Sequence, residues 1–502
     1  MPPRVFTIPA SAPFLPTLIG ALQRGELIEG FPNSADPLAL ANATLFLPTR
    51  RACALARDAF LGALKTDAAV LPRIVPLGDI DEDELAFAEA ATGESALSVP
   101  DATEPLERRL LLAQLILSWI ALPGMRTESG QPLVANTPAS ALALADALAR
   151  LMDDMTTRQV AWSELDGLVP PEHDEYWQKT LAFLRIAREY WPAELAARNK
   201  IDPAARRDLL IEAERKRLET HGGPVIAAGS TGSMPATASL LATIAKLPHG
   251  AVVLPGLDTD LDDASWELIG EIKAGDRIVQ APSFGHPQLA MHGLLRRIGI
   301  VRDDAVALVS SGAREKLTSE ALRPPDATEH WAAQLDVATR EAALAGIAVI
   351  EAANAEDEAL AIAVALRETV HRNNTAALVT PDRALARRVA AALLRWNIEA
   401  DDSGGDRLPD TEAGVFARLV TQAALNGLEP VRLLALLKHA RFRLGAHVGA
   451  HNRAIATLEL AVLRGPRPRR HTRACACARD VSRHEERPAR LRSAQADFGE
   501  RP

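Results

Sequence analysis

This sequence contains few aromatic residues and few cysteines. Aromatic side chains make up 4% of its 502 residues, and only two of them are tyrosines. The three cysteines, Cys53, Cys475 and Cys477, form no CxxC pair and are too few for a disulfide framework. We therefore expect a chain that folds in a reducing compartment. The low aromatic content, together with an excess of alanine and leucine, favours helices.

The sequence also lacks the segments that direct a chain to a membrane. Its first residues, MPPRVFTIPAS, are too short and too interrupted by proline for a signal peptide. No apolar run approaches the length of a membrane span. We expect a cytoplasmic protein with no membrane partner.

An excess of positive charge is lacking as well. The chain has 56 basic and 65 acidic residues, which give a net charge of −9. Contact with nucleic acid therefore has to come from local basic patches, because the overall field does not attract phosphates.

The first strand-to-helix turn lacks the residues that cradle a nucleotide. Apolar runs predict a strand at Val5–Ile8 and a helix at 14–22. A phosphate-binding loop, G-x-x-x-x-G-K-[ST], uses backbone N–H groups and a lysine. The turn between Pro9 and Pro16 has no glycine and no lysine, and its three prolines remove N–H donors. We expect this turn to connect core elements without hydrolysing ATP.

The stretch 346–406 shows the clearest alternation of element types. Short apolar runs predict strands at 347–350, 376–379 and 397–400, with two helices between them. The second helix is expected to begin at Pro381, capped by Thr380. Two successive strand–helix–strand units predict right-handed crossovers and a parallel sheet.

Two of the predicted strand-to-helix turns carry arginine at the start of the helix. Residues 45–51 read LFLPTRR and residues 378–383 read LVTPDR, which places Arg50, Arg51 and Arg383 at these positions. The similarity suggests two related α/β lobes. The alternative interpretation is that the arginines are ordinary solvated residues of surface helices.

The segment 103–220 is predicted to be entirely helical. We interpret its four tryptophans as core anchors of a helical bundle rather than as base-stacking platforms; they are Trp119, Trp162, Trp177 and Trp191. The α/β pattern then resumes with strands at Val225–Ala228 and 251–255. The turn that begins at Gly229 precedes a helix, but it lacks a following lysine and is interpreted as structural.

Two acidic patterns invite a metal hypothesis. The run at 79–84 is interpreted as the favourable acidic start of a helix. Glu271 and Lys273, with two acids upstream, match the E-x-K pattern of metal-dependent nucleases, which requires a strand. The segment 264–272 is predicted to be helical, so we reject that match. We expect no catalytic residue, cofactor or metal site in this chain.

Taken in order, these segments resemble the AddB subunits of bacterial AddAB helicase–nucleases. The resemblance extends from about residue 4 to about residue 469. It is carried by LFLPTRR at 45–51, RIVPLGDIDEDE at 73–84, NTPASALALADALARLMDDMTT at 136–157, the segment 225–257 and WNIEADDSGG at 396–405.

The resemblance implies the architecture of a superfamily 1 helicase, an α/β fold with two RecA-like parallel-sheet lobes. It implies these boundaries: first lobe in 1–100, helical insertion in 101–221, remainder of the first lobe with a linker in 222–345, partial second lobe in 346–426, start of a second helical insertion in 427–470, and a tail in 471–502. The Arg-rich tail lacks periodicity, so we expect it to be disordered and to result from an out-of-frame terminus.

The resemblance also implies a function in double-strand break repair and recombination. The chain is expected to bind single-stranded DNA and duplex ends, in a heterodimer with an AddA-type helicase–nuclease subunit. Arg50, Arg51 and Arg383 are then candidate phosphate contacts. The family's iron–sulfur cluster and nuclease magnesium belong to a C-terminal part that is not in this sequence.

An alternative function is a metabolic α/β enzyme that binds a nucleotide or phosphate at the Gly229 or Gly404 turn. No G-x-G-x-x-G motif follows a predicted strand, and no catalytic histidine or cysteine stands out, which weighs against this alternative.

Overall fold

The chain forms two compact units, Met1–Ile347 and Ala348–Pro502, and each is described by itself. The computed structural model describes residues 2–32, 38–65, 69–77, 99–122, 136–165, 174–220, 222–274, 277–332, 335–405, 407–426, 429–443, 445 and 448–464. The acidic run at 79–84 and the tail at 471–502, with its two cysteines, lie outside the described residues.

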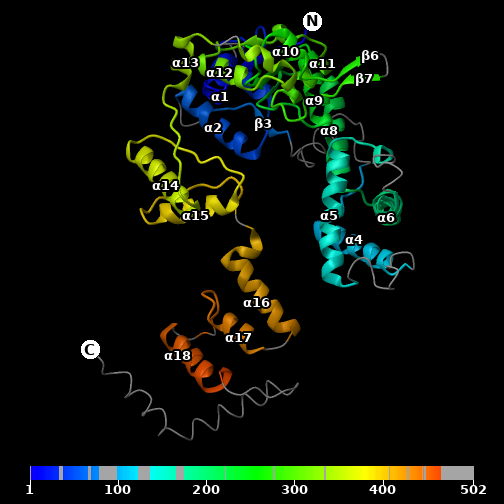
Figure 1. Ribbon diagram of the computed structural model, residues 1–502, viewed down its shortest axis with the longest axis vertical. Helices are drawn as coiled ribbons and strands as arrows, with labels where there is room; N and C mark the ends of the chain where they lie inside the picture. The colour runs from blue at the N-terminus through cyan, green and yellow to red at the C-terminus, as the bar shows by residue number, and fades with distance from the viewer. Residues whose placement is uncertain are drawn as a thin grey trace. The chain divides into compact units, whose positions relative to one another are not determined.

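A six-stranded sheet forms the centre of the first unit, and Figure 1 labels β3, the strand at one edge of this sheet. Its order is β3-β2-β4-β5-β1-β8, and each pair of neighbouring strands is parallel. The strands are β1 (Val5–Ile8), β2 (Thr44–Leu47), β3 (Arg73–Pro76), β4 (Val225–Ala228), β5 (Gly250–Pro255) and β8 (Val306–Ala307). This arrangement confirms the α/β class and the strands predicted in this unit, while β8 was not anticipated.

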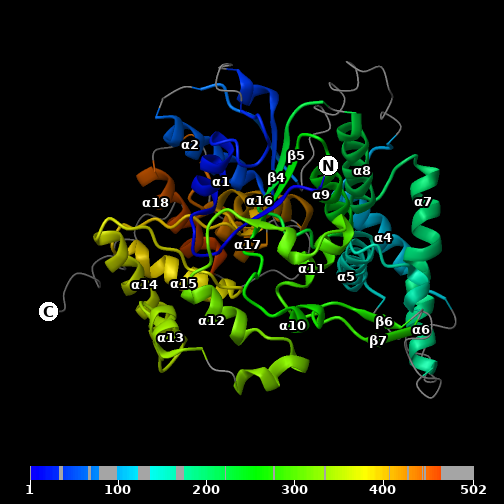
Figure 2. The same ribbon diagram turned by 90° about the horizontal axis from the view of Figure 1, so that it is seen from above.

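Helices cover both faces of the sheet, because side chains that alternate along each strand are buried on opposite sides. Phe6 and Ile8 join a core with α1 (Phe14–Gln23) and α2 (Arg50–Leu64). Val5 joins the core of the other face. That face is covered by α8 (Pro203–Thr220), α9 (Pro235–Lys246) and α11 (Leu289–Ile298). Figure 2 shows α1 and α2 on one side of β4 and β5, and α9 on the other.

A helical insertion separates β3 from β4, as the sequence predicts. It contains α4 (Pro105–Ile120), α5 (Pro138–Thr157), α6 (Asp174–Arg185), α7 (Trp191–Ala197) and α8, with a π-helical turn at Ile186–Tyr190. Trp191 is fully buried in its core, and the ring of Trp119 packs edge-on against Phe183 with centroids 5.0 Å apart. Trp162 is partly buried against the same core. These three tryptophans therefore act as core anchors.

An ion cluster centred on the buried side chain of Arg108 lies in this insertion. An Nη atom of Arg108 lies 2.8 Å from Asp153 and 3.0 Å from Asp202. The indole N–H of Trp191 donates to Asp202 at 3.1 Å. The cluster ties α4 to α5 and to the start of α8.

Two predictions in the last third of the first unit are wrong. The segment 264–272 is not one helix, because α10 (Asp263–Glu267) ends early and β6 (Ile272–Ala274) pairs antiparallel with β7 (Arg277–Gln280). Between α10 and β6 the chain packs closely against the ring of His292. A Cβ on Gly270 would come within 2.2 Å of this ring, so the position requires glycine.

The second wrong prediction concerns residues 318–328, where the adjacent prolines Pro324 and Pro325 predict a loop. Residues up to 321 belong to α12 (Ala313–Ala321), and a 3₁₀ helix (Pro325–Ala332) follows Pro324. The indole N–H of Trp331 donates to the carbonyl of Glu320 at 2.7 Å, which folds this segment back onto α12. The first unit then ends in α13 (Val337–Leu344).

The second unit contains the two predicted helices without the predicted strands. α14 (Ala355–His371) packs on α15 (Arg383–Leu394) through the buried residues Ala359, Ala363, Val389 and Leu393. The cap of α15 is Asp382, whose side chain accepts from the N–H of Ala384, so the prediction of Thr380 as the cap was wrong.

Residues 347–350, 376–379 and 397–400 are not β-strands in the structure. Val349 and Val379 are 83% and 93% exposed, whereas strands of a parallel sheet are buried on both faces. β-Branched residues favour a strand, but a strand forms only where neighbouring strands pair with it. The remaining described helices of this unit are α16 (Glu412–Asn426), α17 (Pro430–Leu437) and α18 (Val448–Leu458).

Across the described residues, no helix combines the length and apolar character that a membrane crossing requires.

Candidate functional site at the carboxyl edge of the sheet

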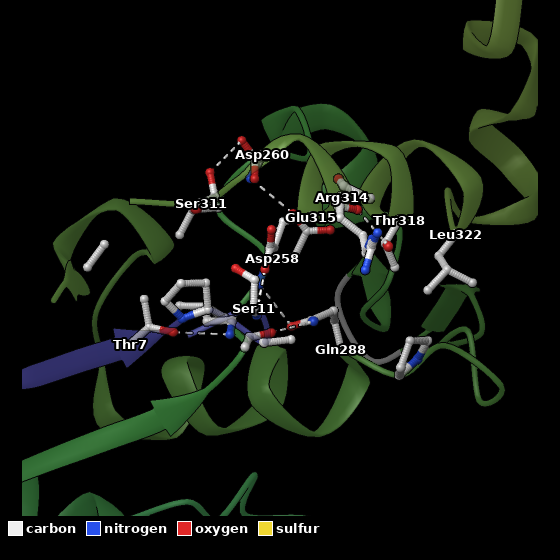
Figure 3. A pocket seen from close by; sticks show the side chains of 18 of the residues that line it. Thr7, Ser11, Asp258, Asp260, Gln288, Ser311, Arg314, Glu315, Thr318 and Leu322 are labelled. Atoms are coloured by element: carbon white, nitrogen blue, oxygen red, sulfur yellow. Dashed lines mark hydrogen bonds between the residues drawn. The ribbon is translucent and has the colours of Figure 1, made fainter. Parts of the chain in front are cut away.

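Ligands of open parallel sheets bind beyond the carboxyl ends of the strands, where neighbouring strands connect to opposite faces. β1 leads to α1 on one face, and its neighbour β5 leads through α10 to α11 on the other. A cavity of about 320 Å³ lies at the ends of β1, β5 and β8 (Figure 3). This volume is at the lower limit for small-molecule sites, which begin at about 300 Å³.

The β1–α1 turn forms one wall of this cavity, and its anion-binding donor is already occupied. The carboxylate of Glu315 accepts from the backbone N–H of Ser11 at 2.7 Å and from that of Gly312 at 3.0 Å. Burial raises the pKa of Glu315, but the hydrogen bonds from Ser11 outweigh burial and hold this pKa below its usual value. Glu315 is thus an ionised group of the chain itself, at the position where a nucleotide-binding loop would hold phosphate.

Two aspartates after β5 form the adjacent wall. Asp258 Oδ1 accepts from the backbone N–H groups of Asp260 and Leu261, each at 3.0 Å. Asp260 accepts from the hydroxyl of Ser311 at 3.1 Å. Each interaction involves one carboxylate oxygen, so the second oxygen of each aspartate keeps its acceptor capacity.

Gln288 and His286 use their hydrogen-bonding groups within the protein. The side-chain amide of Gln288 donates to the carbonyl of Gly256 at 2.9 Å and accepts from Asp258 N–H at 3.2 Å. Nδ1 of His286 lies 3.2 Å from the N–H of Gln288, and its Nε2 lies 2.7 Å from the carbonyl of Leu322. This geometry assigns the proton of a neutral ring to Nε2.

The remaining charged group of the cavity, Arg314, also donates to the chain. Its Nε bonds the carbonyl of Ala343 at 3.1 Å and its Nη2 bonds that of Ala345 at 2.6 Å. Arg314 therefore connects α12 to the end of α13. The lining carries three carboxylates and one guanidinium, and its charge is negative.

One polar group of the cavity has no partner. Ser319 is 5% exposed, and its Oγ makes no hydrogen bond. The hydroxyl of neighbouring Thr318 donates to the carbonyl of Arg314 at 2.8 Å and keeps its acceptor lone pairs. An orphaned buried hydroxyl costs free energy, on the order of 1–3 kcal/mol, unless a ligand or water satisfies it.

A second, apolar crevice of about 330 Å³ lies at the same edge, between the turns after β1, β2 and β4. Pro48 and Ala52 line it, and the two residues between Thr49 and Ala52 are the predicted DNA contacts Arg50 and Arg51. Both arginines are exposed at the start of α2, which is capped by Thr49 accepting from Ala52 N–H at 3.1 Å.

The glycine turn after β4 closes this crevice. Gly229 has a φ of +80°, and a Cβ there would lie 3.4 Å from both Phe14 and Pro48. The positive φ therefore favours glycine, while the space around a Cβ would be ordinary contact, and this supports the structural interpretation of the turn.

The third predicted contact, Arg383, lies in the second unit at the first position of α15. Its two Nη atoms bond both oxygens of Asp402, at 2.9 and 2.6 Å, and one of them also bonds the carbonyl of Gly405 at 3.1 Å. This arginine holds the turn that follows the predicted third strand. The structure thus places Arg50 and Arg51 together in one unit and Arg383 in the other.

Part of the E-x-K segment lies on a strand, against our prediction, since Lys273 belongs to β6 and Glu271 directly precedes it. The acids upstream have structural roles. Asp262 caps α10 through Ser265 and pairs with Arg323, and Asp263 pairs with Arg302 at 2.7 Å. Burial raises the pKa of Asp262, but Arg323 and Ser265 together lower it far below its usual range. Within the described ranges, no three His, Cys, Asp or Glu side chains are arranged to hold a metal ion.

The fold and the site define an α/β protein with a carboxylate-lined cavity at the carboxyl edge of its parallel sheet. Comparison with protein-family models matches no family, and comparison with curated proteins finds no match. Sequence patterns alone did not point to the cavity residues. The position of Asp258 and Asp260 just after a predicted strand could have indicated a site at the edge of the sheet. No local sequence pattern distinguishes Glu315 or Ser319.

Proposed function

We propose that this chain is a DNA-binding, helicase-like subunit of an AddAB-type helicase–nuclease that acts in double-strand break repair and homologous recombination in the cytoplasm. The proposal includes an AddA-type partner subunit, and single-stranded DNA and duplex ends as ligands. It assigns ATP hydrolysis to that partner. It places the iron–sulfur cluster and the nuclease magnesium outside this chain.

The order of elements in the first unit supports the proposal. A parallel sheet with helices on both faces, interrupted after β3 by a helical insertion, agrees with the first RecA-like lobe of a superfamily 1 helicase. In this proposal, α14 and α15 are the helices of a partial second RecA-like lobe, and α16 and the helices after it lead into a second insertion.

The observation that carries the proposal is the position of Arg50 and Arg51 at the exposed first turn of α2. A helix N-terminus carries partial positive charge from its backbone N–H groups, and the first turn of α2 adds two arginines and no acidic residue. Such a helix start favours a bound anion. We assign this anion as a DNA phosphate at the carboxyl edge of the sheet.

The β1–α1 turn supports a subunit without ATPase activity. It provides neither the lysine nor the glycines of a phosphate cradle, and Glu315 accepts from its Ser11 N–H. A nucleotide phosphate would have to displace the carboxylate of Glu315 or bind beside it. Binding beside it is unfavourable because both groups are negatively charged.

The alternative function, an enzyme that binds a nucleotide or phosphate, is favoured by the presence of a cavity at this edge. Its hydrogen bonds weigh against an anionic ligand. The glycine turns also use their donors internally, since Gly232 N–H donates to Ser230 and Gly404 N–H donates to Asp402.

The test is the salt dependence of binding to single-stranded oligonucleotides. We expect the Arg50→Ala/Arg51→Ala double variant to bind every sequence more weakly. For two lost phosphate contacts, the slope of log K against log salt should fall by about 1.4. The matched control is Arg150→Ala/Arg158→Ala, which removes two exposed arginines from the end of the insertion helix α5. Equal slopes for the two double variants would contradict the proposed site.

A further inference from the structure

The connection between the two units has an exposed middle and a fixed end. Residues 348–353, at the start of the second unit, are all exposed. Within the described part of the chain, no hydrogen bond involves their backbone N–H or carbonyl groups. The segment ends at Asn354, whose side chain caps α14 by accepting from the N–H groups of Glu356 and Asp357, each at 3.0 Å. Backbone without hydrogen bonds or burial changes direction at little cost in free energy.

The other end of this segment is a type II turn. After α13, Ala345 has φ −56° and ψ 127°, and Gly346 has a φ of +75°. The N–H of Ile347 donates to the carbonyl of Leu344 at 3.0 Å and closes the turn. Type II geometry requires a positive φ at its third position, which glycine adopts without strain. The last residues of the first unit therefore have a defined conformation.

Arg314 holds this turn from a distant part of the chain. Its Nε donates to the carbonyl of Ala343 at 3.1 Å, and its Nη2 donates to that of Ala345 at 2.6 Å. The last carbonyls of a helix have no partner inside the helix, so the guanidinium satisfies groups that α13 leaves open. A cation at this end of a helix also interacts favourably with the helix dipole.

The start of α12, which carries Arg314, is itself fixed to the central sheet. The next residue, Glu315, accepts from the N–H of Ser11 in the turn between β1 and α1. Figure 3 shows Arg314 and Glu315 next to each other on this helix. Two consecutive side chains thus hold the edge of the sheet and the turn at the boundary of the first unit.

We propose that residues 348–353 are the hinge between the two units and that Arg314 is the clamp that sets where the hinge begins. While the clamp is closed, bending is confined to the residues after Ile347. When it opens, the turn and the end of α13 join the hinge, and the second unit gains a wider range of positions. This inference does not depend on the proposed function, because it uses only the contacts that flank the connection.

Hydrogen exchange measured by mass spectrometry tests the clamp in Arg314→Met. The matched control is Arg296→Met, at an exposed arginine that donates to the carbonyl of Glu271 at 3.3 Å. We expect the amides of Ala345 and Ile347 to exchange about tenfold faster in Arg314→Met, the effect of losing charge-assisted hydrogen bonds, with α14 unchanged. Equal exchange in the two variants, or acceleration throughout the first unit, would overturn the clamp.

Two further variants separate the clamp from a general effect of charge. Arg314→Lys keeps the cation but lacks the fork that reaches two carbonyls, so we expect protection between that of Arg314→Met and that of the unaltered protein. Gly346→Ala strains the same turn from the other side and should accelerate exchange of the same amides. Unchanged exchange in Gly346→Ala would show that the turn does not protect them.

Small-angle X-ray scattering tests the hinge. We expect a larger radius of gyration and a broader distribution of intramolecular distances for Arg314→Met than for the unaltered protein, and no change for Arg296→Met. Because both variants carry the same type of substitution at an exposed arginine, the difference reports the position of the arginine. Identical scattering from the three proteins would refute the hinge.

Discussion

The carboxylate of Glu315 and the backbone N–H of Ser11 form a 2.7 Å hydrogen bond between residues 304 positions apart. Through this bond the first turn of α12 is fixed to the turn between β1 and α1. The bond also closes the place where a nucleotide phosphate would be held, so it explains in one contact both the position of α12 and the absence of a phosphate cradle.

Replacing Glu315 tests this contact directly. Glu315→Ala leaves Ser11 N–H without its acceptor and removes the side chain that caps Gly312 N–H. We expect a loss of stability of about 1 kcal/mol, because both donors are near solvent. Hydrogen exchange measured by mass spectrometry should show faster exchange in the peptide that contains Ser11.

The conservative variant Glu315→Gln keeps an acceptor and should retain most of that protection at neutral pH. The wild-type contact should also weaken in acid. Since the folded state lowers the pKa of Glu315, the stabilisation is present above the unfolded pKa, about 4.3, and is lost as pH falls through the folded value. Protection that stays constant down to pH 3 would show that the carboxylate is not the acceptor that matters.

Arg108 should contribute far more to stability than its neighbour Arg109. The side chain of Arg108 is 10% exposed, and its partner Asp202 is 12% exposed, so Arg108→Met leaves a buried carboxylate without its cation. We expect a loss of about 3 kcal/mol. Arg109 pairs with Asp146 at 2.7 Å in an exposed position, and Arg109→Met should cost about 0.5 kcal/mol.

Urea unfolding followed by circular dichroism at 222 nm gives the midpoint of each variant. The comparison is matched because both substitutions lie on α4. Similar midpoints for the two would mean that Asp202 is stabilised well enough by Trp191 and the N–H of Ala204 alone.

His292 should make the first unit sensitive to mild acid. It is buried beside Trp266, and burial lowers its pKa; nearby Arg296 lowers it further, while Glu267 opposes the shift. The unfolded chain therefore takes up a proton near pH 6.5 before the folded chain does. Stability is complete above that pH and falls as the pH decreases toward the folded pKa.

We expect the melting temperature to fall between pH 7.5 and 5.5, and the variant His292→Leu to flatten this dependence even if its melting temperature is lower throughout. His249→Leu, at an exposed histidine, is the control. A pH profile that is the same in His292→Leu and in the unaltered protein would assign the acid sensitivity to other groups.

Local sequence patterns predicted the elements that depend on neighbouring residues. The short apolar runs of β1, β2, β4 and β5 are bounded by turn residues, and the apolar spacing of the insertion marks its helices. Thr49 precedes α2 and caps it, as its side chain dictates. The absence of glycine and lysine from the β1–α1 turn was also evident from the sequence.

The tertiary structure decided which apolar runs became strands. Residues 44–47 pair on both sides, with β3 and β4, whereas residues 347–350, which are richer in β-branched side chains, have no ladder and stay exposed. The hairpin β6–β7 begins within a predicted helix, and its two strands are held by pairing with each other. A strand is stabilised by partners that are distant in sequence, so its local pattern is insufficient.

The candidate cavity likewise depends on contacts between residues that are distant in sequence. Its walls come from the turn after β1, the segment after β5 and the helix α12, and the first of these lies hundreds of residues before the other two. The amino-acid sequence by itself determined the α/β class, the helical insertion and the exposed arginines at the start of α2. The contact between Glu315 and Ser11 and the orphaned hydroxyl of Ser319 were decided by tertiary packing, because only folding determines which groups come within hydrogen-bonding distance.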